Sequence, residues 1–218
     1  MRLIGLTGGI STGKTTVSNY LSKNYQFPIW DADVYGREAV KPGSSILKSI
    51  VEHYGQNIVL PNGNLDRRQL GEIVFNDQKE LLWLQKQIHP YVRDRFEQNI
   101  KYFIAKNSEF EQTNYIQVTS HKITSQDVTA VLVIPLLFEA KMTDLVTEIW
   151  EIYAPAHQQI ERLIKRDCLT QQQAYTRINN QMSLSEKCQK GDIVVDNSST
   201  LEALLKQVDS VIAYPQKN

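Results

Sequence analysis

Cysteine is scarce in this sequence, with only Cys168 and Cys188 among 218 residues. Two cysteines form neither a disulfide framework nor a metal-ligand cluster, so we expect a reducing, cytoplasmic setting. An excess of charge of one sign is also lacking, because 24 basic residues balance 24 acidic ones. Without a global basic field, the composition favours neither nucleic acid nor a membrane surface as a partner, and any anion site must be local.

Long hydrophobic runs are missing as well. No segment reaches the roughly 18 apolar residues that a membrane-crossing helix needs. The chain is instead 41% hydrophobic and 22% charged, which is typical of a globular protein with a substantial core. Its length suits one domain, or one domain with a sizeable insertion.

Short apolar runs alternate with helical patterns along much of the chain. Apolar and β-branched runs predict buried strands, and apolar residues three or four positions apart predict helices. The expected strands are residues 2–7, 28–30, 130–139, 148–154 and 192–196, and the helices among them are residues 14–25, 156–166 and 200–214. Strands that alternate with helices indicate an α/β fold with a parallel sheet.

One long region carries no strand pattern. From about residue 40 to residue 106 the apolar residues recur with the helical period, and turn clusters such as "KPGSS" separate the helices. This pattern predicts a helical insertion. The stretch that follows, residues 107–127, is polar and aperiodic, and we expect an exposed loop or hairpin there.

The stretch "LTGGISTGKTT" contains the spacing Gly-x-x-x-x-Gly-Lys-Thr, from Gly8 to Thr15. A loop around a triphosphate points its backbone N–H groups inward, and glycine adopts the required conformations most easily. Lys14 could reach the β- and γ-phosphates, and the Thr15 hydroxyl could bind Mg²⁺. The plain alternative is a glycine turn between a strand and a helix, with Lys14 in solvent. The strand before the loop and the helix after it favour the nucleotide site.

Two acidic residues, Asp31 and Asp33, follow the second expected strand. Ligands in such sheets bind beyond the carboxyl ends of the strands, so a carboxylate there could accept the proton of an attacking hydroxyl. We assign Asp33 as the base and Asp31 as its support. Either residue could equally be an N-cap of the helix expected at residues 32–40. The motif "DVYG" also fits a GTPase switch, but the sequence has no N-K-x-D guanine motif.

Taken in order and spacing, several stretches together resemble the dephospho-CoA kinase family. They are "GLTGGISTGKT", "DAD", "PGSSI", "NGNLDRRQLGEIVF", "IHP", "VIPLLFE", "RLIKRD…RINNQ" and "DIVVDNS", and they run over nearly the whole chain. The resemblance implies a three-layer P-loop NTPase fold with a parallel sheet, a helical substrate-binding insertion and a lid. It also implies that ATP, with Mg²⁺, donates its γ-phosphoryl group to the 3′-hydroxyl of the dephospho-CoA ribose, the last step of coenzyme A biosynthesis.

The resemblance divides the chain into three parts. Residues 1–39, 128–166 and 191–218 would form the nucleotide-binding core, residues 40–127 the insertion that receives dephospho-CoA, and residues 167–190 the lid. Asp33 matches the family's base. Within the insertion, the candidates for substrate contact are Arg67, Arg68, His89 and Arg93, with Asp31 at the edge of the core. For His89, a helix boundary held by Pro90 is an equal alternative.

Residues 11–16 match those that hold the ATP phosphates in the family. With the lid arginines, the expected nucleotide-binding residues are Gly8, Gly9, Ser11, Thr12, Gly13, Lys14, Thr15, Thr16, Arg162, Arg177 and Asn197. The family usually reads G-G-I-G-S-G-K, so Ser11 stands at a position that is normally glycine. A serine fits there without strain only if its backbone keeps a negative φ. Gly191–Asp192 also departs from the usual Ala–Asp before the last strand.

The lid prediction depends on arginines at helical spacing. Arg162 and Arg166 lie four residues apart on one helix face, and Arg177 and Gln181 repeat the spacing. Charged helix faces are usually solvated, but in a kinase a mobile arginine-bearing segment can close over the triphosphate. We expect Lys14, Asp33 and Arg166 to be catalytic and Asn197 to lie near the adenine or in the turn after the last strand.

Two other functions fit the same motifs. One is a nucleoside or nucleoside-monophosphate kinase of the same architecture. The other, which the missing guanine motif and the large insertion disfavour, is a nucleotide-dependent switch. For the assembly we expect a monomer or a small homo-oligomer with small-molecule partners only.

Overall fold

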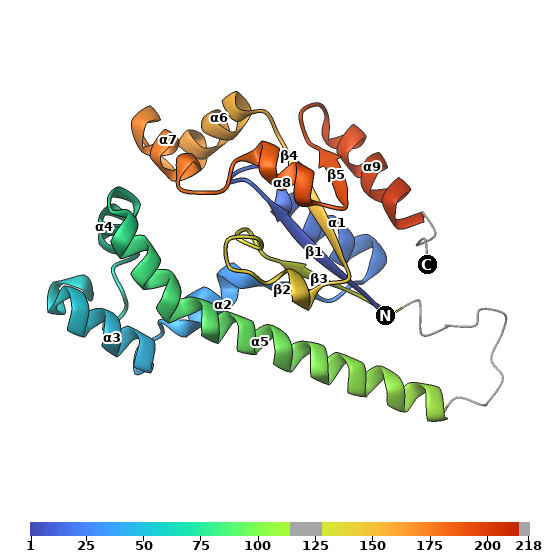
Figure 1. Ribbon diagram of the computed structural model, residues 1–218, viewed down its shortest axis with the longest axis horizontal. Helices are drawn as coiled ribbons and strands as arrows, with labels where there is room; N and C mark the ends of the chain where they lie inside the picture. The colour runs from blue at the N-terminus through green and yellow to red at the C-terminus, as the bar shows by residue number, and fades with distance from the viewer. Residues whose placement is uncertain (114–127, 214–218) are drawn as a thin grey trace. The chain divides into compact units, whose positions relative to one another are not determined.

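The computed structural model describes residues 1–113 and 128–213 (Figure 1). The chain divides into two compact units, one made of Met1–Trp30 with Lys106–Asn218 and one made of Asp31–Ala105. The first unit contains most of the sheet and the second is almost entirely helical. Each unit has its own buried apolar core.

The sheet has five strands in the order β2-β3-β1-β4-β5. The strands are β1 (Arg2–Gly8), β2 (Ile29–Asp31), β3 (Thr129–Val133), β4 (Glu148–Tyr153) and β5 (Ile193–Asp196). The β1–β3, β1–β4 and β4–β5 pairings are all parallel. The α/β class and the parallel sheet predicted from the sequence are therefore confirmed.

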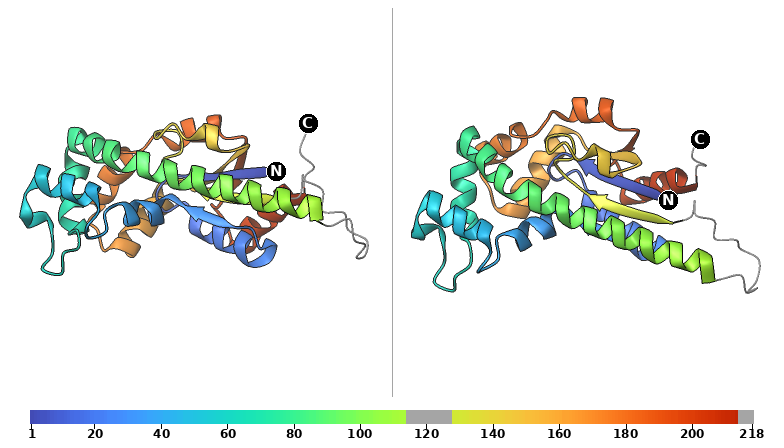
Figure 2. Two further views of the ribbon diagram at one scale, coloured as in Figure 1. Left: turned by 90° about the horizontal axis from the view of Figure 1, so that it is seen from below. Right: turned by 60° about the horizontal axis from the view of Figure 1, so that its bottom comes forward.

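One face of this sheet is covered by α1 (Lys14–Tyr25) and α9 (Leu201–Ala213), as the two views of Figure 2 show. Both helices bury apolar residues four apart, because a stripe of that spacing faces one side of a helix. The buried members of this core are Ile4, Leu6, Val17, Leu21, Val131, Val133, Trp150, Ile152, Val195, Leu204 and Val208. β1 is buried from its second residue onward, so both of its faces are covered.

The segment between β4 and β5 forms three helices. They are α6 (Ala156–Asp167), α7 (Gln171–Asn179) and α8 (Leu184–Lys190), and α8 packs against β4. α7 and α8 each begin with a capping box, in which a hydroxyl side chain and the side chain three residues later exchange hydrogen bonds with the backbone. The residues predicted to form the lid, 167–190, are therefore mostly helical.

The strand predicted at residues 130–139 is shorter than expected. β3 ends at Val133, and residues 135–141 form turns. Pro135 has no backbone N–H to donate, so it cannot continue a strand in the middle of a sheet. The apolar run continues beyond the strand because Ile134 and Leu137 are also buried.

The second unit is built from helices packed on one another. Its elements are α2 (Ala32–Ala39), α3 (Ser45–Tyr54), η1 (Gln56–Ile58), α4 (Arg67–Asn76) and the larger part of α5 (Gln78–Thr113). The Ser44 side chain caps α3 and the Asp66 side chain caps α4, each by accepting backbone N–H groups. The helices predicted from periodicity in this region are confirmed.

Two expectations about α5 are wrong. Residues 107–113, which were expected to begin a loop, continue the helix to Thr113; residues 114–127 lie outside the described part of the chain. His89 is not at a helix boundary either, because Pro90 lies inside α5. The long helix continues through this proline, and the buried Val92 and Phe96 follow it on the packed side.

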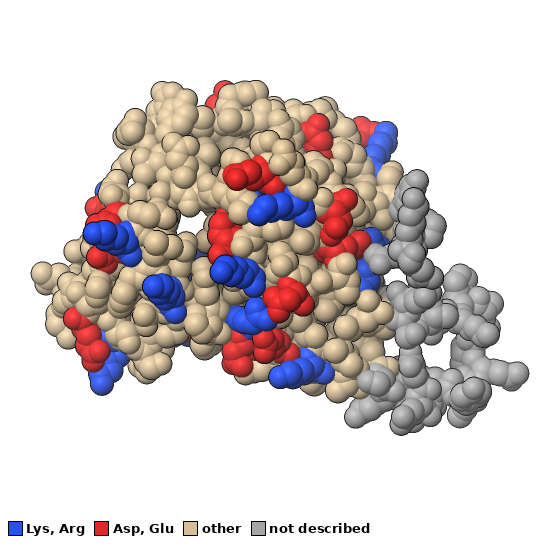
Figure 3. Space-filling view, viewed as in Figure 1, with Lys and Arg blue, Asp and Glu red and all other residues tan. Residues whose placement is uncertain are grey.

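The described surface mixes both signs of charge. On the face drawn in Figure 3, acidic and basic side chains lie next to one another over the described residues. In residues 1–113 and 128–213, no helix combines the length and the apolar character needed to span a membrane.

Candidate active site

The phosphate loop, residues 8–16, connects the end of β1 to the first turn of α1. Gly8 and Gly13 have φ of 150° and 107°. A Cβ on Gly8 would lie 2.6 Å from the Ile152 carbonyl oxygen, and one on Gly13 would collide with the Asn197 amide. No side-chain hydrogen bond caps α1, and the N-terminus of a helix favours a bound anion. The loop therefore has the geometry that its sequence pattern predicts.

Ser11 has a left-handed backbone, with φ of 59°, so the condition under which a serine fits here without strain is not met. The Thr12 N–H donates to the Gly9 carbonyl at 3.4 Å and closes a four-residue turn in which Ser11 is the third residue. That is the position at which a type II turn needs a positive φ. The backbone at this position thus keeps the left-handed conformation that glycine adopts easily, although a serine occupies it. The Ser11 Oγ is buried without a hydrogen-bond partner among the described residues.

Lys14 folds back over the loop. Its Nζ donates to the carbonyls of Gly8 and Gly9 at 2.8 and 2.7 Å. The buried Thr12 Oγ1 also donates to the Gly9 carbonyl, at 2.9 Å. This contradicts the plain alternative of a strand-to-helix turn with Lys14 in solvent. The ammonium group and the helix N–H groups together make a local positive site in a chain of zero net charge.

Asn197, directly after β5, supports the loop from the other end of the chain. Its Nδ2 donates to the Thr12 carbonyl at 2.7 Å. Arg162 in turn donates from Nη2 to the Asn197 carbonyl at 3.2 Å and to the Gln158 Oε1 at 2.8 Å. Both residues were predicted from the sequence to bind the nucleotide. Asn197 contacts the phosphate loop directly, and Arg162 contacts Asn197.

The other two arginines predicted to contact the phosphates, Arg166 and Arg177, meet at Asp167, a residue to which the sequence motifs assign no role. Arg166 contacts its Oδ1 at 2.7 Å and Arg177 its Oδ2 at 2.9 Å. The hydrogen bond from Arg166 is the main reason that the pKa of Asp167 is lowered. Asp167 holds two cationic groups together at the junction of α6 and α7. Its signal in the sequence is an acid directly after an arginine, which is too common to be selective.

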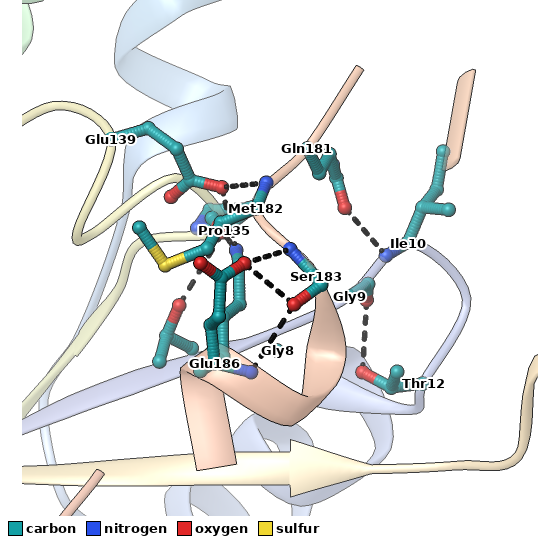
Figure 4. A network of polar contacts seen from close by, with 12 residues as sticks. Gly8, Gly9, Ile10, Thr12, Pro135, Glu139, Gln181, Met182, Ser183 and Glu186 are labelled. Atoms are coloured by element: carbon teal, nitrogen blue, oxygen red, sulfur yellow. Dashed lines mark hydrogen bonds and ion pairs between the residues drawn. The ribbon is translucent and has the colours of Figure 1, made fainter. Parts of the chain in front are cut away.

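A second tether joins the segment between α7 and α8 to the phosphate loop (Figure 4). The Gln181 side chain points at the loop, and its Oε1 accepts the Ile10 N–H at 3.0 Å. The next residue, Met182, donates its N–H to the Glu139 Oε1 at 2.9 Å. The segment predicted to form the lid is therefore hydrogen-bonded to the phosphate loop and to the turns after β3.

Charged groups that no motif revealed lie under this tether. Lys187 of α8 is fully buried, and its Nζ contacts the Glu139 Oε1 at 3.0 Å and the Pro135 carbonyl at 2.8 Å. Glu151 of β4 is also fully buried. Its signal in the sequence is an acidic residue between the apolar residues Trp150 and Ile152 of β4.

Asp31 and Asp33 belong to the second unit. The Asp31 Oδ1 accepts the Asp33 N–H at 2.7 Å and caps α2. Burial raises the pKa of Asp31. Asp33 is exposed in the first turn of α2. The capping role considered for either residue is therefore found for Asp31, and it leaves the Asp33 carboxylate accessible.

Arg67 and Arg68 begin α4. Arg67 donates from Nη2 to the Arg37 carbonyl at 3.3 Å, and burial lowers its pKa. The Arg68 side chain is 90% exposed and lies 3.4 Å from the Glu72 Oε1. Neighbours in the sequence thus have different environments.

His89 and Arg93 lie four residues apart in α5, and so on the same side of that helix. Arg93 also contacts the Glu97 Oε1 at 2.9 Å, one turn further along. An imidazole and a guanidinium group therefore share one face of α5.

The parallel sheet, the glycine geometry of the loop and the lysine folded over it define a protein of the P-loop NTPase class. Residues 2–114 and 111–203 match the family model described as dephospho-CoA kinase. The chain belongs to the dephospho-CoA kinase family.

Named relatives agree with this assignment. The chain is 51% identical over 213 residues to a dephospho-CoA kinase of Trichormus variabilis, with 98% of this chain and 97% of that one covered. It is 47% identical to one of Synechocystis, with 95% and 92% covered. Among solved structures it is similar to the Thermus thermophilus protein TT1252, at 25% identity and a TM-score of 0.71, with 99% and 98% covered. A dephospho-CoA kinase from Campylobacter jejuni, at 21% identity, shares the fold with a TM-score of 0.62, with 96% of each chain covered.

Proposed function

We propose that this protein transfers the γ-phosphoryl group of ATP to the 3′-hydroxyl of dephospho-CoA. The observation that carries the proposal is the phosphate loop, in which Lys14 and the first N–H groups of α1 surround a place for an anion. Phosphoryl transfer needs placement and charge more than covalent help from the protein. Membership of the dephospho-CoA kinase family supplies the acceptor.

Lys14 and the loop backbone would hold the β- and γ-phosphates. The Thr15 hydroxyl is exposed in the first turn of α1, and it is an oxygen donor of the kind that Mg²⁺ prefers. Among the described residues no three His, Cys, Asp or Glu side chains are grouped as a metal site, so Thr15 would share the ion with the nucleotide's own oxygens. When bound, Mg²⁺ would neutralise charge on the phosphates.

Asp33 is the proposed general base. It would accept the proton of the 3′-hydroxyl as that oxygen attacks the γ-phosphorus. Its exposed carboxylate and the capping bond from its N–H to Asp31 support this role, because the cap fixes the turn that presents it. Asp31 is proposed to lie among the substrate-binding residues and to support Asp33 by accepting its N–H.

Arg162, Arg166 and Arg177 would neutralise charge on the transferring group, with Arg166 nearest to it. Asp167 keeps Arg166 and Arg177 together, so a movement of this junction would carry both guanidinium groups at once. Closure of such a segment excludes water from the reaction. The proposed lid is residues 167–190, and the proposed core is residues 1–39, 128–166 and 191–218.

The insertion, residues 40–127, is proposed to receive dephospho-CoA. Arg67, Arg68, His89 and Arg93 are its proposed contacts, because cationic and imidazole groups suit the phosphates of that substrate. A cytoplasmic location, and a monomer or small homo-oligomer, complete the proposal.

The first experiment measures ADP formation from MgATP with dephospho-CoA, and separately with a panel of nucleosides and nucleoside monophosphates. We expect turnover with dephospho-CoA well above that with any member of the panel. A higher rate with a nucleoside would replace this function with a nucleoside kinase activity. ADP formation that no acceptor changes would indicate a switch.

Two variants test the assigned roles. Asp33→Asn should lower kcat by about 100-fold or more while the affinity for ATP changes little. Lys14→Ala should weaken both nucleotide affinity and turnover. Asp94→Asn in the second unit and Lys23→Ala in α1 change the same charges at exposed positions and serve as matched controls. Unchanged turnover in Asp33→Asn would remove this residue from the mechanism.

A further inference from the structure

Glu151 is a carboxylic acid enclosed in the first unit. Its relative exposure is 0%, and neither carboxylate oxygen has a hydrogen-bond partner among the described residues. The Cβ position of Gly191 lies 3.1 Å from the Glu151 Cβ, so the backbone before β5 packs closely against it. A buried carboxylate is normally hydrogen-bonded or paired, so the unpartnered state of Glu151 within the described residues requires an explanation.

Charged and titratable groups from three elements interact electrostatically with Glu151. α8 contributes Lys187 and Cys188, the turns after β3 contribute Glu139, and the phosphate loop contributes Lys14. The residues beside it on the flanking strands are Thr7 and Val194, which do not titrate. Glu151 is therefore electrostatically connected to the lysine that would bind the nucleotide.

The surroundings favour the neutral acid and the ionised form to similar extents. Burial raises the pKa of Glu151, the charges of Lys187 and Lys14 lower it, and Glu139 raises it again, so that the pKa is about 7. Lys187 is already engaged by Glu139 and the Pro135 carbonyl. A modest change of charge at the phosphate loop is then enough to change the protonation of Glu151 near neutral pH.

Nucleotide binding produces such a change. The phosphates add negative charge at the loop, and they attract the Lys14 ammonium group, which in the nucleotide-free protein helps to stabilise the ionised acid. We propose that Glu151 takes up a proton from solvent when nucleotide phosphates bind the loop, and that it is a positioning residue which competes for Lys14 only while ionised. The inference depends on the proposed function only in that a nucleotide must bind.

The first test is calorimetric titration of the protein with ADP at pH 7.5 in buffers of different ionisation enthalpy, which reports the protons taken up. The wild type should take up roughly half a proton more than Glu151→Gln. Its ADP affinity should also fall with rising pH, relative to that variant, by up to about tenfold per pH unit above 7. Comparing the two proteins removes the titration of the nucleotide's own phosphate. Glu161→Gln, which neutralises an exposed acid on α6, should behave as the wild type.

Equal proton uptake in the wild type and Glu151→Gln would overturn the proposal. A buried acid with a merely structural role would change stability without producing any difference in proton uptake. If Glu151→Gln does not fold, Glu151→Leu replaces it, because a leucine fills a similar volume without polar atoms.

The second test needs no nucleotide and keeps a failure of the proposed function separate. The pKa of Glu151 is raised from 4.5 to about 7 in the folded protein, so its contribution to stability is full below pH 4.5 and is lost as the pH rises to 7. The free energy of unfolding should fall more steeply over this range in the wild type than in Glu151→Gln. Parallel curves would overturn the proposal. If the curves diverge but ADP does not bind, the proposed function fails and the coupling fails with it.

Discussion

At the residue scale, Ser11 is a local conflict between sequence and conformation. A residue with a Cβ costs about 1 kcal/mol or more in the left-handed region, and here the turn between Gly9 and Thr12 imposes that region. Within residues 1–113 and 128–213, the buried Ser11 hydroxyl gains no hydrogen bond in return. The loop is therefore shaped by its surroundings rather than by the preference of this residue.

Ser11→Gly should stabilise the protein by roughly 0.5 kcal/mol, because relief of the strained φ exceeds the extra chain entropy that glycine brings to the unfolded state. Chemical denaturation with a constant m-value measures this difference. Ser22→Gly makes the same change in α1, where φ is ordinary, and should destabilise instead. Equal destabilisation by both substitutions would mean that Ser11 is not strained.

Some residues of the candidate site could be predicted from their neighbours in the sequence, and others could not. The positions of Gly8, Gly13 and Lys14 could be predicted because the loop's conformation depends on neighbours a few residues away. The residues that contact or surround the loop from distant parts of the chain could not be predicted in this way. Asn197 was assigned to the nucleotide without its bond to Thr12, and Gln181 and Glu151 were brought close only by the packing of distant segments.

At the element scale, the connection between α7 and α8 is joined to the phosphate loop by one side chain. The Gln181 bond to Ile10 is a neutral hydrogen bond, of the kind that stabilises by about 1 kcal/mol. A bond of this strength can break and re-form during turnover. The two helices on either side have their own capping boxes, so they persist when the bond opens.

Gln181→Ala should raise the exchange rate of the Ile10 amide hydrogen about fivefold, with little change in the global free energy of unfolding. Hydrogen exchange followed by NMR or mass spectrometry measures it. Gln172→Ala removes an exposed glutamine side chain from α7 and is the matched control. No change of exchange at Ile10 would show that the bond does not hold the segment.

Element boundaries were predicted less well than element types. Proline had opposite effects in two places, because β3 stops before Pro135 whereas α5 continues through Pro90. A strand in a sheet needs the N–H that proline lacks, but a long helix can lose one bond and remain packed by its neighbours. Periodicity does not distinguish these outcomes, since they depend on tertiary contacts.

At the scale of the whole molecule, alternating strands and helices were enough to predict a parallel α/β fold. The strand order β2-β3-β1-β4-β5 was not predictable, because β1 lies between two strands that come more than a hundred residues later in the chain. Long-range pairings leave no periodic trace in the sequence. The helical insertion was predicted to begin at about residue 40, whereas the compact helical unit begins at Asp31, directly after Trp30.

Asn197→Ala should weaken ADP binding several-fold, because the carbonyl of Thr12 loses its donor and the loop becomes less ordered. Calorimetric titration with ADP measures the affinity. Asn24→Ala removes an exposed amide that donates to the Tyr20 carbonyl within α1, and this variant should bind ADP as the wild type does. Unchanged affinity in Asn197→Ala would show that the loop holds its shape without this support.

The contact between Thr12 and Asn197 spans 185 positions of the chain. During synthesis on a ribosome, the phosphate loop leaves the ribosome well before Asn197, whose amide supports it, because Asn197 comes 185 positions later in the chain. A nascent chain that ends before β5 would therefore contain the whole glycine motif but lack the hydrogen bond from Asn197 that supports it. The ability to bind a nucleotide should therefore arise only after Asn197 has left the exit tunnel.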